Sequence, residues 1–65
     1  MQPLLGTLPS GEKVVIINIG PAFPGPRNRM EATVVNVTGT LQVVRLEDVT
    51  ITGPAPADWT LESLA

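Results

Sequence analysis

The sequence contains no cysteine, no histidine and no tyrosine, and it has a single tryptophan and a single phenylalanine. Without cysteine, neither a disulfide framework nor a thiolate metal site can reinforce the chain. Without histidine, carboxylates are the remaining common ligands, and no Asp-x-Asp-x-Asp spacing of a calcium loop occurs. We therefore expect neither a metal site nor a cofactor.

Charge is also scarce, because four basic and six acidic residues give a net charge of −2. Modules that bind duplex nucleic acid usually carry a clear basic excess, so nucleic acid is disfavoured as a partner. No apolar run approaches the roughly 18 residues that span a bilayer, and the N-terminus lacks the pattern of a signal peptide. We expect a cytoplasmic or virion-associated protein that does not enter a membrane.

Apolar residues, by contrast, are abundant for so short a chain, at 43% of 65 residues. A chain of this length forms one domain, here residues 1–65, and buries only about 60% of its unfolded surface. The apolar residues that cannot fit inside predict contact with a protein partner or with other copies of the chain.

The strongest strand signal is Lys13–Ile19, which contains four consecutive β-branched residues. Such a run is typical of a strand that is buried on both faces. One face is expected to contact the core and the other, with Val15 and Ile17, a partner. Residues 1–12 are interpreted as a lead-in that ends in a turn.

A hairpin is predicted from two apolar segments, Met30–Thr38 and Thr40–Glu47, joined by a tight turn at Thr38-Gly39. In both segments the apolar positions change face midway, and this turn places Val34 opposite Val43, where the two changes meet. Such a change marks a sharp bend, a bulge or burial on both faces. We expect a bent hairpin of the kind that closes a small sheet into a barrel.

The sheet is expected to continue beyond this hairpin. A second tight turn at Glu47-Asp48 would bring Leu46 opposite Val49 and put apolar side chains on one face. This agreement predicts a three-strand meander over Met30–Thr52. The segment Gly53–Ala57, rich in proline and glycine, then forms a stiff connector.

The C-terminal residues are expected to form a short helical turn, with Asp58 or Thr60 as its cap. This turn would bring Trp59 over an open end of the barrel. Two roles stay open for Trp59, since a lone tryptophan can cover a core or anchor an interface.

The segment Gly20–Arg29 is expected to form an irregular loop, because it holds three prolines and two glycines. It also holds Phe23, Arg27 and Arg29, which could stack a base and hold a phosphate. The two arginines could equally pair with acidic residues of a neighbouring surface or subunit, and the negative net charge favours this alternative. Its Pro-x-x-Pro spacing is that of adaptor ligands, although a rigid loop explains it as well.

No residue set that could catalyse a reaction emerges from the sequence. The neighbouring carboxylates of Glu47 and Asp48 lie in a predicted exposed turn, where water solvates both charges. Ser10 and Ser63 have no histidine to act as a base, and Lys13 is the only lysine. We expect no catalytic residues.

Taken together, Gly11–Ile16, Glu31–Val35 and Val43–Leu46 resemble in rhythm the SH3-like small β-barrel, over roughly residues 11–64. The resemblance implies an all-β fold, a barrel of about five bent antiparallel strands with a short C-terminal helical turn. SH3-like domains that bind proline-rich ligands use several surface aromatics, which this chain lacks. Type II dihydrofolate reductases look like the same barrel in a tetramer, but their Val-Gln-Ile-Tyr segment has no counterpart here.

The sequence thus favours a non-enzymatic protein-interaction or structural module over an enzyme. It would be a β-barrel subunit of a larger assembly, such as a virion or accessory subunit, or of a homo-oligomer. The residues expected to bind a partner are Val15, Ile17, Phe23, Arg27, Arg29 and Trp59. Two alternatives remain: a barrel that binds single-stranded nucleic acid through the 20–29 loop, and a small oligomeric enzyme with its site at a symmetry axis.

Overall fold

The computed structural model describes residues 2–22, 25 and 28–64, and its strands form one antiparallel five-stranded sheet. The all-β class and the short C-terminal helical turn are confirmed. In chain order the elements are β1 (Leu4–Thr7), β2 (Lys13–Pro21), β3 (Met30–Asn36), β4 (Leu41–Arg45), the 3₁₀ turn η1 (Leu46–Asp48), β5 (Thr50–Pro54) and the 3₁₀ turn η2 (Leu61–Leu64).

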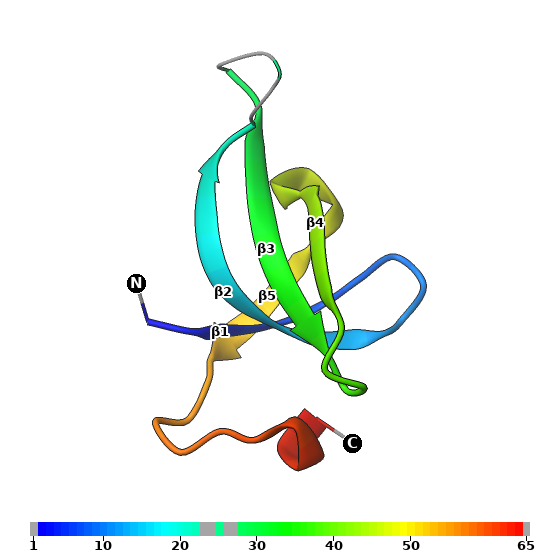
Figure 1. The fold of residues 1–65 in the computed structure, drawn as a ribbon, viewed down its shortest axis with the longest axis vertical. Coiled ribbons are helices and arrows are strands. Elements are labelled where there is room, and N and C mark those ends of the chain that lie inside the picture. Colours follow the sequence, from blue (N-terminus) through cyan, green and yellow to red (C-terminus); the bar gives the residue numbers. More distant parts are fainter. Residues whose placement is uncertain (1, 23–24, 26–27, 65) are drawn as a thin grey trace.

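The sheet has the strand order β4-β3-β2-β1-β5, so β2 belongs to both of its halves. The first residues of β2 pair with β1 on one side and with β3 on the other. The later residues of β2 pair with β3 alone. Figure 1 shows β2, β3 and β4 following the long axis of the molecule, with β1 and β5 crossing them. The molecule measures 35 × 24 × 19 Å.

The prediction of a lead-in over residues 1–12 is wrong, because Leu4–Thr7 forms β1. This strand lies between β2 and β5, and it pairs Leu5 with Val15 on one side and with Gly53 on the other. Four residues are too few to show a strand period in the sequence. This segment is a strand because it pairs with β2 and with β5, and β5 is far away in the chain.

The predicted three-strand meander is also wrong, since β5 pairs with β1 and not with β4. In place of a tight turn at Glu47-Asp48, the chain makes the 3₁₀ turn η1, closed by a hydrogen bond of 3.2 Å from the Val49 N–H to the Leu46 carbonyl. This turn directs Val49 into the core and leads the chain across the sheet to β1.

The hairpin of β3 and β4 has its register one residue away from the predicted one, so Val34 lies opposite Gln42 and Val43 lies opposite Thr33. The cause is a three-residue loop over residues 37–39. Asn36 Oδ1 accepts hydrogen bonds of 3.0 Å from the N–H groups of Thr38 and Thr40. Gly39 adopts a φ of +86°, as the third residue of such a loop requires.

The main core lies between the two halves of the sheet. Its buried members are Val14, Ile16, Ala32, Val34 and Val49. Gly6 of β1 permits this packing, because a Cβ atom there would lie 2.9 Å from Cγ1 of Val49. The crossing of β1 over the core therefore needs a residue without a side chain.

A second, smaller cluster lies on the opposite face of the sheet and consists of Val15 and Val35. Leu5, Trp59 and Leu61 pack against it. Burial on both faces explains why the apolar positions of β3 change face after Val34. Trp59 covers this cluster and stays half-buried, which agrees with the core-covering role. Its interface role stays a prediction.

Candidate functional site

The outer face of the sheet is the face that carries the second cluster, and only part of it is covered. Val15, Val35 and Leu41 lie side by side across β2, β3 and β4. Trp59 and Leu61 cover the first two, whereas Leu41 is 64% exposed. Among the described residues, Trp59 and Leu61 therefore cover β2 and β3 on this face and leave Leu41 of β4 largely exposed.

A second exposed row follows on the same face. Val43 lies beside Thr33 of β3, and Thr33 lies beside Asn18 of β2. A bulge between Ile16 and Asn18 adds Ile17 to this row. Bulges of this kind leave one residue unpaired and bend the strand.

We define the outer patch as Ile17, Leu41 and Val43. Their side chains are 38%, 64% and 63% exposed. In β4 the alternate residues behave differently, because Val44 packs against the main core. The strand alternation thus separates one core residue from two exposed apolar ones.

Strand β4 is also an end of the sheet, since β3 is its only strand neighbour among the described residues. An edge strand presents unpaired N–H and C=O groups that another strand can bind. Proteins usually protect such edges with charged side chains, proline or a bulge. Among these devices β4 has one charged residue, Arg45 at its end, so the backbone edge of Leu41–Val44 lies unprotected next to the outer patch.

The six residues predicted to bind a partner lie in different places. Val15 has no exposed surface in this conformation, and Trp59 is half-buried above it. Ile17 is exposed and belongs to the outer patch. Phe23 and Arg27 lie outside the residues that the structure describes.

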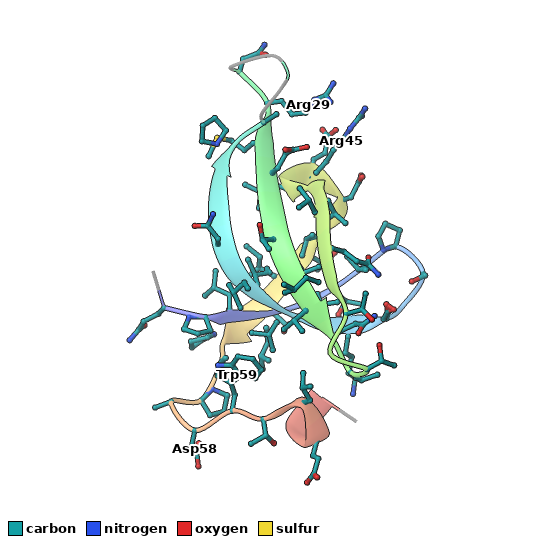
Figure 2. All side chains as sticks on the ribbon, viewed as in Figure 1. Arg29, Arg45, Asp58 and Trp59 are labelled. Atoms are coloured by element: carbon teal, nitrogen blue, oxygen red, sulfur yellow. The ribbon has the colours of Figure 1, made fainter. Side chains whose placement is uncertain are left out.

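Arg29, the remaining one, is exposed at the end of the molecule opposite Trp59, and Arg45 lies beside it (Figure 2). Both line an open hollow of about 550 Å³ together with Asn28, Met30, Leu46 and Glu47. Sequence reasoning did not pick out Arg45, because the wrong hairpin register hid its place beside the 20–29 loop.

The charges around this hollow offset one another. Arg45 Nη1 lies 3.6 Å from Glu47 Oε1, and both side chains are largely exposed. Glu31 is the cross-strand neighbour of Arg45, and Asp48 follows in η1. Acidic side chains thus accompany the two arginines at this end of the described structure, so it carries no clear excess of positive charge.

Metal binding finds no support in the described part of the chain, where no three acidic side chains gather closely enough to hold an ion. The helical segments of that part include none that is long and apolar enough to cross a membrane.

The exposed residues of β4 are the feature that sequence reasoning missed. The sequence predicts Leu41 and Val43 in the second strand of a bent hairpin, with a third strand beside them. In the structure that side of β4 has no strand among the described residues. The signal that could have found them is the Asn-Val-Thr-Gly sequence of residues 36–39, which fits a three-residue loop with glycine at its third position.

Comparison of the chain with protein-family models, curated proteins and solved structures finds no match.

Proposed function

We propose that this chain is a non-enzymatic protein-interaction or structural module, a small SH3-like β-barrel subunit of a larger assembly or homo-oligomer. Its contact surface would be the outer patch together with the free edge of β4. The observation that carries the proposal is the exposure of Leu41 and Val43, above 60% each, on an unprotected edge strand. A cytoplasmic or virion setting would suit such a subunit.

The exposed apolar side chains support this proposal, since Leu41 is 64% and Val43 is 63% exposed. Removal of apolar surface from water is favourable by roughly 25 cal/mol of free energy for each Å². Covering the outer patch would therefore stabilise a complex, and the open edge would supply directional hydrogen bonds.

Two measurements on one pair of variants test the proposal. The double substitution Leu41→Thr, Val43→Thr places a residue that favours β-strands at both positions and replaces apolar side chains of the outer patch with hydroxyl-bearing ones. The matched control is Ile51→Thr, because Ile51 is also an exposed apolar residue, 46% exposed, on the other edge strand. Light scattering over a concentration series reports self-association, and quantitative pull-down from the native source reports other protein partners.

We expect the native chain and the Ile51→Thr control to form a complex that the double variant loses. The complex can contain copies of the chain or another protein. A native chain that stays at 6.9 kDa up to high concentration, and that retains no protein which the double variant releases, would show that the proposal is wrong.

A second candidate, single-stranded nucleic-acid binding, has one observation in its favour, namely that Arg29 and Arg45 line the same hollow. Arg45 is already paired with Glu47, which weakens this candidate. Binding through phosphates would weaken steeply as salt rises, because counterions are released. Titration of a labelled oligonucleotide at low and at moderate salt, with Arg29→Ala as the variant, tests it. Absence of binding at low salt excludes it.

A further inference from the structure

We infer that β4 pairs with β4 of a second copy of the chain, in antiparallel orientation, about a twofold axis that passes beside Gln42. This inference rests on the proposed function and names the partner. It joins the two five-stranded sheets into one continuous sheet and makes the outer patches of the two copies adjacent.

The backbone of β4 presents the right groups. The Asn36 N–H donates a hydrogen bond of 3.1 Å to the Thr40 carbonyl, so the backbone groups of Thr40 point toward β3. Backbone groups alternate in direction along an antiparallel strand. Those of Gln42 and Val44 therefore also point toward β3, while those of Leu41 and Val43 point to the free edge.

This alternation restricts the register of the pairing. Outward-facing residues of one copy must lie opposite outward-facing residues of the other. An axis beside Gln42 places Leu41 opposite Val43 of the second copy, and Val43 opposite its Leu41. Each of these two Leu41–Val43 pairs exchanges two backbone hydrogen bonds, which makes four in all. Four apolar side chains then form one cluster on the outer face, next to the row that Trp59 and Leu61 cover.

The lack of charge on this edge permits pairing with another copy. In a twofold pairing, any charged side chain near the axis comes close to its own counterpart, which is unfavourable. Residues 38–44 carry no charge. Arg45, the nearest charged residue, would lie opposite Gly39 of the second copy, far from the other Arg45. A strand of acidic or basic character would find no complementary charge on this edge.

The size of the contact predicts its strength. Stable specific interfaces bury about 800 Å² on each partner. One pair of short strands with two exposed apolar side chains on each copy, Leu41 and Val43, buries less, so we expect a dimer in the micromolar range of dissociation constant rather than a permanent one. This expectation sets the concentrations at which the pairing must be sought.

Single cysteines provide the test, since the native chain contains none. In the inferred pairing Gln42 lies opposite Gln42 of the second copy, in a pair without mutual hydrogen bonds, where Cα atoms are about 4.5 Å apart. That distance lies within the range of a disulfide. The variants are Gln42→Cys, Val43→Cys for the neighbouring register, and Thr52→Cys on β5 as the matched edge control. Each is oxidised mildly at a concentration where light scattering shows dimer.

We expect Gln42→Cys to form a disulfide dimer at least tenfold faster than Thr52→Cys, and expect the double substitution Leu41→Thr, Val43→Thr to abolish this difference. Faster oxidation of Val43→Cys would overturn the register. Equal rates at positions 42 and 52 would overturn the pairing. If the chain is monomeric but the outer patch retains another protein in pull-down, the second copy is the wrong partner and the proposed function stands. If neither occurs, both fail.

Discussion

The two faces of the sheet formed by β2, β3 and β4 differ in how they are covered. On the inner face, β1, β5 and η1 cross the sheet, and Val14, Ile16 and Val34 lose all contact with water. On the outer face, a single segment with Trp59 and Leu61 covers Val15 and Val35 and leaves Leu41 and Val43 exposed. The difference teaches that the inner face holds the fold together, whereas the outer face is only partly used for folding.

The covering segment between β5 and η2 is attached by hydrogen bonds and by apolar packing. The Ala55 N–H donates to the Pro3 carbonyl at 3.0 Å, and the Trp59 N–H donates to the Pro56 carbonyl at 3.1 Å. The cluster that it covers has two buried residues, Val15 and Val35, whereas the main core has five. The outer face is therefore expected to contribute less stability than the inner face.

The largest expected effect is on the inner face. Ile16→Ala removes a fully buried side chain from the main core and should lower the free energy of unfolding by about 3–4 kcal/mol, within the usual range for such truncations. Urea unfolding followed by circular dichroism measures it. The matched control is Ile51→Ala, an exposed site where we expect less than about 0.5 kcal/mol. Similar losses at both sites would contradict the division between the faces.

A smaller effect is expected where the outer face is covered. Trp59→Ala removes a half-buried ring from Val15 and Val35 and should cost about 2 kcal/mol, less than truncation of a fully buried large residue. It should also increase binding of a hydrophobic fluorescent dye, because both valines become accessible. The Trp59→Phe variant, which keeps an aromatic ring, should lose about half as much. A loss above that of Ile16→Ala would place the main stabilising contacts on the outer face.

The turn between β3 and β4 serves both faces, because it sets the register in which Val44 meets the main core while Leu41 lies beside Val35 on the outer face. Asn36→Ala removes the acceptor of the bonds from the Thr38 and Thr40 N–H groups, and should cost about 1 kcal/mol. Asn36→Asp keeps the acceptor oxygen and should retain most of the stability. Thermal unfolding of the two variants side by side measures this. Equal losses would mean that the side-chain acceptor contributes little to the turn.

The smallest effect on stability is expected at the uncovered part of the outer face. The double substitution Leu41→Thr, Val43→Thr should change the free energy of unfolding of the dilute monomer by less than about 0.5 kcal/mol, since both side chains are mostly exposed. The same variant should lose self-association. Denaturant unfolding at two protein concentrations separates the effects, because only an associating protein gains stability with concentration. A large loss in the dilute variant would mean that the patch belongs to the core.

Much of the fold was predictable because it depends on local patterns. The run Val14–Ile17 predicted a strand with two buried faces, and the residues after the proline-rich connector predicted a short helical turn. Trp59 lies on Val15 and Val35 at the outer face of the sheet, and not over an open end of the barrel as predicted. The pairing of β1 with β5 was not predictable in this way. It depends on the course of η1 and on the missing side chain of Gly6, and neither leaves a periodic signal.

The candidate site was missed for a related reason. An error of one residue in the hairpin register exchanges the faces of a whole strand. With Val34 placed opposite Val43, the exposed row of β4 could not be recognised. Whether a strand lies at an edge is a property of the complete strand order. Here β4 lies at an edge because β5 pairs with β1 and not with β4.

The pairing of β1 with β5 also has a consequence for the order in which contacts form during folding. Thr52 and Leu5, which share a hydrogen bond of 3.3 Å, are 47 residues apart, whereas Asn36 and Thr40 are four residues apart. Contacts between distant residues require a larger loss of chain entropy before they gain any energy, so they tend to form late. Substitutions at the β3–β4 turn should therefore slow folding. Substitutions where β1 pairs with β5 should mainly speed unfolding. The contacts between these two strands would therefore determine how long the native state lasts before it unfolds.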